Sequence, residues 1–133
     1  STEHNLAALL PLVTDRTWPQ IMFCSDDREC STLLHDGHMD ETLRRAVAGG
    51  LDPVRAIQLC TLNPARYWGF GDHGAIAPGR RADLVVLDDR HGPLAGAPPG
   101  EVLDRYLFAT DRAAPRHVMV RGRWRVRDGV ALR

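Results

Sequence analysis

Two adjacent carboxylates, Asp26 and Asp27, follow a compact apolar run after one intervening residue, Ser25, and are the side chains of this sequence best suited to chemistry. The run, residues 20–24 (QIMFC), has the length and composition of a buried strand in a parallel sheet. Carboxylates at the C-terminal end of such a strand lie where α/β barrels build their active sites. The alternative is that one of the two only caps the next turn. Arg28 follows and is placed to pair with either carboxylate.

Other reactive side chains near this segment give weaker signals. His35 and His38 have H-x2-H spacing, but such a pair with no further ligand nearby is poor evidence of a metal site. His38 is better interpreted as hydrogen-bonded within the loop or as lining a pocket. Cys24 lies within the apolar run and is interpreted as a small buried hydrophobe rather than a nucleophile. Tyr67 and Trp68 are predicted to be core residues.

Helices are expected on both sides of the predicted strand. The pairs Asp52-Pro53 and Asn63-Pro64 are helix start signals, with Asp or Asn as the N-cap and Pro in the first helical position. Between the strand and these helices, residues 25–38 are polar and are expected to be a loop with one helical turn. The expected helices cover residues 3–13, 40–48, 53–60 and 63–68.

After Gly71 the sequence changes to short strand-like runs separated by turns that contain Gly. The Arg residues of 112–133 mostly alternate with apolar residues, which predicts the exposed side of a hairpin. Residues 90–100 are rich in Pro and Gly and are expected to be a loop. We therefore predict a helical, barrel-like part (residues 1–71) and a small β part (residues 72–133). The expected strands cover residues 74–78, 82–87, 117–120 and 123–126.

The composition argues against some partners. Lys+Arg is 17 and Asp+Glu is 17, so there is no electrostatic argument for nucleic acid or an anionic membrane. No apolar run approaches the roughly 18 residues of a membrane-spanning helix. The cysteines number 3, with no metal-finger spacing, so a disulfide framework is not expected and a reducing compartment is the default. We expect a cytoplasmic protein that binds neither nucleic acid nor membrane.

Four segments together resemble the amidohydrolase superfamily: CSDDR, LLHDGHMD, GGLDPVRAIQLCTLNPARYWGF and GAIAPGRRADLVVLDD. The pattern LNPA…G…G.I.PG..ADLVVLD is shared across that superfamily, whereas F-C-S-D-D-R followed by G-H-M-D is narrower and is similar to the adenine deaminases. The resemblance runs from about residue 5 to residue 129. It implies an α/β fold, namely the last helix-strand-helix part of a TIM-type (β/α)8 barrel plus strands of a small composite β-sandwich. The chain would be the C-terminal portion of the catalytic region.

The resemblance also implies a site. In that family the Asp after the eighth barrel strand binds a divalent metal and shuttles a proton, and here the matching residue is Asp26. Asp27, Arg28 and His38 would hold a ligand or contact a purine; for Asp27, a solvated loop carboxylate is the alternative. The implied cofactor is a binuclear divalent metal centre, with manganese or iron ahead of zinc. The implied reaction is hydrolysis of adenine to hypoxanthine and ammonia, in purine salvage.

Part of the family pattern is missing from this chain. The superfamily's metal site needs an H-x-H pair after the first barrel strand, and the 6 His residues include no such pair. A full barrel takes about 250 residues. We therefore expect a piece of a longer, homo-oligomeric protein, inactive by itself. The alternatives are another amidohydrolase acting on a cyclic amide or N-acyl substrate, and a non-catalytic binding or assembly module.

Overall fold

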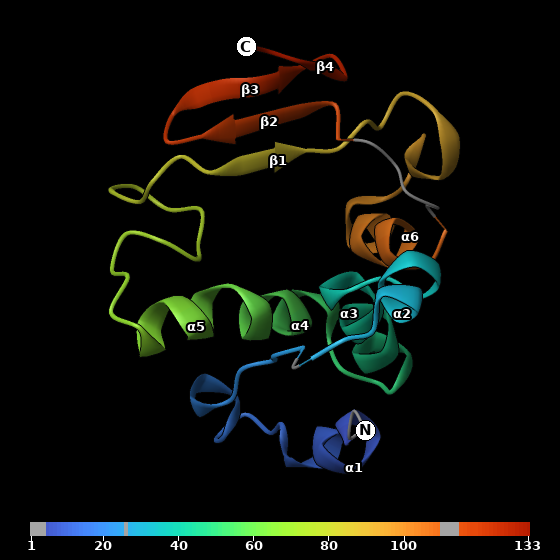
Figure 1. The fold of residues 1–133 in the computed structure, drawn as a ribbon, viewed down its shortest axis with the longest axis vertical. Helices are drawn as coiled ribbons and strands as arrows, with labels where there is room; N and C mark the ends of the chain where they lie inside the picture. Colours follow the sequence, from blue (N-terminus) through green and yellow to red (C-terminus); the bar gives the residue numbers. More distant parts are fainter. Residues whose placement is uncertain (1–4, 26, 110–114) are drawn as a thin grey trace. The chain divides into compact units, whose positions relative to one another are not determined.

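The computed structural model describes residues 5–25, 27–109 and 115–133. The chain forms two compact units, Ser1–Phe70 and Gly71–Arg133. The first unit contains helices, and the second contains a small antiparallel sheet together with short helices (Figure 1). In the described part of the chain, every helix is too short or too polar to cross a membrane.

The first unit is built from short helical segments, and its centre is the set α3, α4 and α5 (Figure 1). Small side chains at Ala46 of α3 and Ala56 of α4 are fully buried and let these two helices pack closely, and Leu59 of α4 is fully buried as well. The elements are α1 (Leu6–Leu9), the 3-10 helices η1 (Leu10–Leu12) and η2 (Trp18–Gln20), α2 (Cys30–His35), α3 (Met39–Ala48), α4 (Pro53–Cys60) and α5 (Leu62–Tyr67).

The start signal at Asp52-Pro53 is confirmed. The Asp52 side chain accepts a hydrogen bond from the backbone N–H of Arg55 at 2.8 Å, and Pro53 is the first residue of α4. The second signal, Asn63-Pro64, correctly predicts a helix but assigns the wrong residue as its N-cap. Asn63 lies inside α5, which begins at Leu62, and its side chain bonds to another segment.

The predicted strand over residues 20–24 is wrong for this structure. Trp18–Gln20 form the 3-10 helix η2, and Ile21 then begins an extended stretch that pairs with no strand. The backbone N–H of Phe23 donates instead to the carbonyl of Leu59, at 3.0 Å. A strand needs a hydrogen-bonded neighbour, and the strands of the described residues all lie between Leu84 and Ala131. From Ile21 onward the apolar run is therefore extended but outside any sheet of the described residues.

Three expected burials are also corrected. Cys24 is exposed, because the extended stretch that carries it is not covered on both faces. Tyr67 and Trp68 are 69% and 66% exposed and contact each other edge to face, with ring centroids 5.0 Å apart. The reason is the orientation of α5: its buried positions are Leu62, Asn63 and Ala65, so its last turn faces solvent.

The second unit contains a four-stranded antiparallel sheet in the order β1-β2-β3-β4 (Figure 1). Its core includes Leu94 and Leu107, which come from the segment between β1 and β2. The strand predicted over residues 74–78 does not form, and the helix α6 was not predicted. The elements are β1 (Leu84–Val86), the 3-10 helices η3 (Gly92–Leu94) and η4 (Pro99–Glu101), α6 (Val102–Phe108), β2 (His117–Val120), β3 (Arg123–Arg127) and β4 (Val130–Ala131).

Two-residue turns join the last three strands. Arg121 and Gly122 connect β2 to β3 with φ values of 51° and 73°, and Asp128 and Gly129 connect β3 to β4 with φ values of 47° and 77°. Two consecutive positive φ angles define the type I′ turn, whose twist suits a hairpin. The prediction of an Arg-lined hairpin is confirmed, because β3 alternates between exposed Arg residues and half-buried apolar side chains.

Candidate functional site

The residue predicted to be catalytic, Asp26, lies outside the described residues. Its neighbour Asp27 is exposed, and Ser25 on the other side is half-buried. Ser25 and Asp27 lie in the segment that connects the extended stretch after η2 to the start of α2, which we call the 25–29 loop. Ser25, Asp27 and Arg28 are therefore the described residues nearest in sequence to the predicted catalytic residue.

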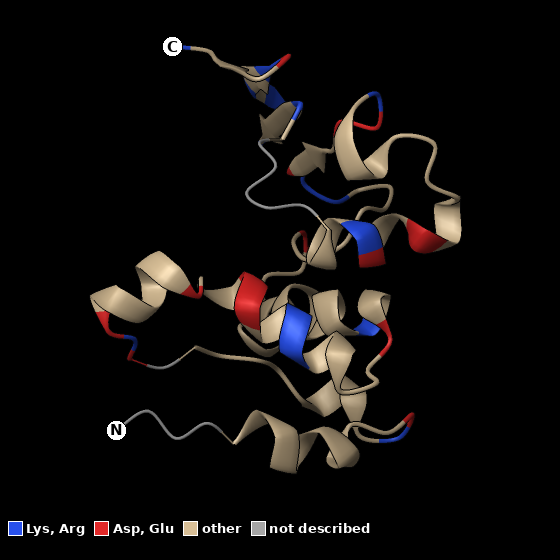
Figure 2. Ribbon diagram, turned by 90° about the vertical axis from the view of Figure 1, so that its right-hand side faces the viewer, with Lys and Arg blue, Asp and Glu red and all other residues tan. Residues whose placement is uncertain are grey.

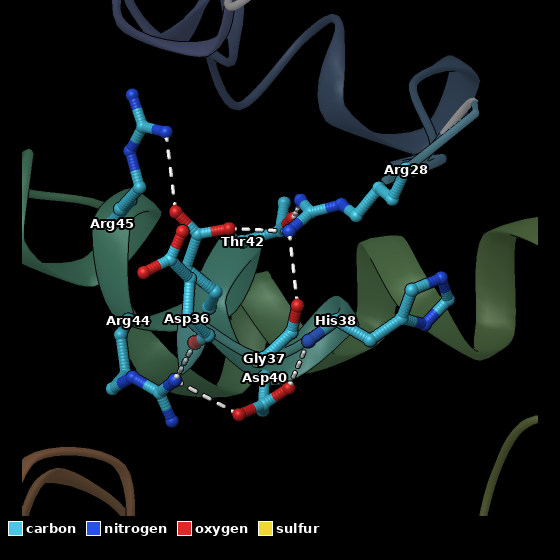
Figure 3. A network of polar contacts seen from close by, with 9 residues as sticks. Arg28, Asp36, Gly37, His38, Asp40, Thr42, Arg44 and Arg45 are labelled. Atoms are coloured by element: carbon cyan, nitrogen blue, oxygen red, sulfur yellow. Dashed lines mark hydrogen bonds and ion pairs between the residues drawn. The ribbon is translucent and has the colours of Figure 1, made fainter. Parts of the chain in front are cut away.

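Arg28 turns away from solvent and contacts the start of α3 (Figure 3). Its guanidinium donates to the carbonyl of Gly37 at 3.2 Å, to the Thr42 hydroxyl at 3.1 Å and to the Glu41 carboxylate. The side chains of Arg28 and Glu41 are only 12% and 18% exposed, so solvent screens this ion pair weakly. Arg28 thus binds the 25–29 loop to the first turn of α3.

Glu41 is shared between two arginines. One carboxylate oxygen accepts from Arg28, and the other accepts from Arg45, one turn further along α3, at 3.4 Å. Burial raises the pKa of Glu41, but the hydrogen bond and charge of Arg28, with a further contribution from Arg45, hold that pKa below its ordinary value. The carboxylate is therefore ionised near neutral pH.

His38 is exposed, and its ring points away from the ion pairs (Figure 3). Its backbone N–H donates to the Asp40 carboxylate at 2.7 Å, and Asp40 also pairs with Arg44 at 2.9 Å. Burial raises the pKa of Asp40, but the His38 N–H and the Arg44 guanidinium outweigh it, and the net shift is downward. This second network fixes the N-terminus of α3, and His38 contributes to it through its backbone.

A cavity of about 550 Å³ opens in the first unit beside the 25–29 loop. Its walls are mostly apolar and come from α1, η1 and the extended stretch, while Arg28, Glu29, Thr32, Thr42 and Arg45 supply the polar part. A space of this size and polarity is adequate for a small organic molecule. The apolar walls include Leu6, Leu9, Leu10, Val13, Ile21, Met22 and Phe23.

Sequence reasoning missed Glu41 and Asn63. Glu41 lies in the GHMDE run, but its ion pair with Arg28 is evident only in the folded chain. Asn63 is 4% exposed, and its amide nitrogen donates to the carbonyls of Trp18 and Ile21 at 2.6 and 2.7 Å. The LNPA motif contains this Asn and was the available signal, although it was interpreted as a helix cap.

The described residues do not form a metal site by themselves. Within residues 5–25, 27–109 and 115–133, no group of three or more His, Cys, Asp or Glu side chains is arranged to hold a cation. His35 is engaged locally, since its Nδ1 lies 2.8 Å from the carbonyl of Ser31. Cys60 is half-buried, and burial raises the pKa of its thiol to about 11, which disfavours a thiolate ligand.

Charges are dispersed over both units. All 17 basic residues are arginines, and in Figure 2 blue and red segments occur in each unit rather than gathering on one. Several form ion pairs with carboxylates, such as Arg55 with Asp15 at 2.7 Å and Arg105 with Glu101 at 2.8 Å.

Comparison of the sequence with known proteins identifies a family. Residues 2–125 match the family model described as "Amidohydrolase family". A protein named adenine deaminase from Methanoregula boonei is 51% identical over 92 residues, which is 68% of this chain and 16% of the relative. Adenine deaminases from Dehalococcoides mccartyi and Oleidesulfovibrio alaskensis are 54% and 46% identical over 89 residues, again 67% of this chain and 16% of each relative. With nearly its whole length matched, the chain belongs to the amidohydrolase family.

Proposed function

We propose that this chain is the C-terminal portion of the catalytic region of an enzyme that hydrolyses adenine to hypoxanthine and ammonia. The observation that carries the proposal is the identity of about half of the aligned residues to proteins named adenine deaminase. The matched region spans only 16% of those relatives, so the activity is proposed for a longer protein. The chain alone is proposed to be inactive.

The amidohydrolase family implies a TIM-barrel-type fold. We assign residues 1–71 to the end of such a barrel and residues 72–133 to strands of a small sandwich domain. The division into compact units after Phe70 supports this assignment, as does the change from helices to an antiparallel sheet. Under this assignment the 25–29 loop follows the last barrel strand, and the extended residues 21–24 are the chain of that strand.

In the proposed reaction, the oxygen of water attacks C6 of adenine and the bond from C6 to the exocyclic nitrogen breaks. Asp26 takes a proton from the attacking water and gives it to the departing nitrogen, so that ammonia leaves. Asp27 lies beside it in the chain and is proposed to contact the purine or a ligand of the site. The cavity next to Arg28 supports this location, because its apolar walls suit a flat heterocycle.

The family also implies a divalent metal cofactor. When bound, such a metal makes water easier to deprotonate. From this chain we propose Asp26 as one ligand, with the remaining ligands outside the described residues, since these hold no cluster of three. Manganese or iron in a binuclear centre, a homo-oligomeric assembly and a cytoplasmic location remain predictions.

The test is to express the longer protein and follow the loss of adenine by absorbance, with divalent metal added, for the wild type and for Asp26→Asn. We expect the wild type to be active and the variant to lose at least about 100-fold in kcat, because the proton transfer is lost. Bound metal without turnover of adenine would redirect the search to cyclic amides and N-acyl compounds. Absence of both metal and activity would favour a binding or assembly module.

A further inference from the structure

The 25–29 loop is held to α3 through one side chain whose donors are directed at protein groups. Arg28 donates from one terminal nitrogen to Gly37 and Glu41, and from the other to Thr42. Glu41 and Thr42 lie in the first turn of α3, and Gly37 stands two residues before the helix (Figure 3). A planar guanidinium bound through both terminal nitrogens has a fixed orientation as well as a fixed position.

Glu41 gives this contact its strength. Its side chain is only 18% exposed, and Thr42 beside it is buried, so the guanidinium meets a carboxylate in a weakly screened place. Removing the carboxylate would leave a 12% exposed arginine without its counter-charge, which strongly favours a rearrangement of Arg28. The second partner of Glu41, Arg45, is more exposed at 45% and cannot take over this role, because it carries the same charge as Arg28.

Chain connectivity links this contact to the two carboxylates. Asp27 is next to Arg28, and Asp26 is two residues before it. Because the chain is covalently continuous, an anchor at Arg28 limits how far the residues next to it in the sequence can move.

We propose that the Arg28–Glu41 ion pair positions the 25–29 loop for the reaction, and that Glu41 is a positioning residue acting through Arg28 without touching substrate. This inference rests on the proposed deamination, in which Asp26 is the acting carboxylate. It differs from the expectation that Arg28 contacts the purine, because the donors of Arg28 are directed at α3. The two roles predict different kinetics: a positioning residue affects kcat, whereas a substrate contact chiefly affects KM.

The experiment uses the longer protein and a small set of variants. Glu41→Gln removes the charge with little change of shape, and Arg28→Lys keeps the charge but loses the forked geometry. Arg28→Glu alone and Arg28→Glu combined with Glu41→Arg test whether a reversed pair restores function. The matched control is Arg44→Gln, which removes another arginine of α3, one that pairs with Asp40 and does not line the cavity. For each protein we would measure kcat, KM, the melting temperature and the rate of amide hydrogen exchange in a peptide covering residues 25–29.

For Glu41→Gln we expect kcat to fall about 10- to 100-fold, the range seen when a group that orients a ligand is removed. KM should change less than about threefold, and exchange in the loop should quicken while α4 keeps its protection. Arg28→Lys should behave likewise, Arg44→Gln should stay within about twofold of wild type, and the reversed pair should recover at least about tenfold over Arg28→Glu alone.

A Glu41→Gln protein with unchanged kcat would overturn the proposal, and so would a rise in KM alone, which would make Arg28 a substrate contact. If a variant fails to fold, Arg28→Lys and the reversed pair still decide through the same measurements. If the wild type does not deaminate adenine, the proposed function fails and hydrogen exchange alone decides the inference. Faster exchange of the 25–29 peptide in Glu41→Gln then supports the anchor, and unchanged exchange overturns it.

Discussion

Gly37 lies between the two polar networks at the start of α3, and two features of the structure disfavour any other residue at this position. Its φ of +107° is strained for any residue with a side chain. A Cβ at this position would lie 2.6 Å from one Asp40 carboxylate oxygen and 2.8 Å from the other. The carbonyl of Gly37 also accepts from Arg28, so a shift here would affect both networks.

We predict that Gly37→Ala lowers the free energy of unfolding by about 2–3 kcal/mol, combining backbone strain with displacement of the Asp40 carboxylate. Gly50→Ala is the matched control, because Gly50 has a φ of +95° and a Cβ at that position would have nothing within 4 Å. It should lose only about 1 kcal/mol. Urea unfolding of both variants measures the difference, and equal losses would show that the contact with Asp40 is unimportant.

At the residue scale, the sequence shows which side chains could be reactive and in what order they occur. It does not show which other side chains they contact in the folded chain. Asp26, Asp27 and Arg28 attract attention because they follow an apolar run. The partner of Arg28 is Glu41, 13 positions further along the chain. That pairing depends on how the loop and α2 fold back to α3, which is a property of tertiary structure and has no local signal.

At the scale of elements, hydrogen bonds from the Asn63 side chain join α5 to η2. Its amide group donates to the carbonyls of Trp18 and Ile21, which lie at the two ends of η2. Without Asn63, each of these carbonyls would lose a hydrogen-bond donor. Asn63 itself is buried. The hydrogen bonds thus fix where the extended stretch leaves η2, just before the 25–29 loop.

We predict that Asn63→Asp lowers the free energy of unfolding by about 2–3 kcal/mol near neutral pH. The substitution keeps the shape but turns a buried donor into an acceptor that faces two carbonyl oxygens. Gln20→Glu makes the same chemical change at an exposed neighbouring position and should lose less than about 0.5 kcal/mol. Thermal unfolding of both variants checks this, and a mild effect at Asn63 would contradict the assigned hydrogen bonds.

Elements with local signals were predicted well, and those that depend on distant partners were not. Asp52-Pro53 starts α4 as expected, because a cap and a fixed φ act within a few residues. Residues 20–24 have strand composition but no neighbouring strand among the described residues. The helix α6 was overlooked beside its Pro- and Gly-rich flank, although Glu101 and Arg105 form an i, i+4 pair at its start.

For the whole molecule, the notable feature is how much large apolar surface remains exposed. Ile76 is 85% exposed, and Tyr67 and Trp68 are exposed as well, whereas few large side chains among the described residues are fully buried. The sheet adds edges at β1 and β4, and Val85 on β1 is exposed. Exposed apolar groups and open strand edges both favour association.

We therefore predict that the 133-residue chain alone associates as its concentration rises, because association covers apolar surface. Sedimentation velocity over the micromolar range should show a rising mean sedimentation coefficient. Trp68→Ser should weaken this association, while Arg66→Ser, which changes an exposed polar residue two positions earlier, should leave it unaltered. A chain that stays monomeric throughout this range would contradict the prediction.

The paired type I′ turns have a consequence for the order in which the second unit folds. Arg121-Gly122 and Asp128-Gly129 bring β2, β3 and β4 together through contacts between near neighbours in the chain. Joining β1 to β2 requires closing a loop of residues 87–116, which carries a larger entropic penalty. Hairpins form within microseconds and low contact order favours speed. The three-stranded meander should therefore form first and act as the template on which Leu84–Val86 later docks.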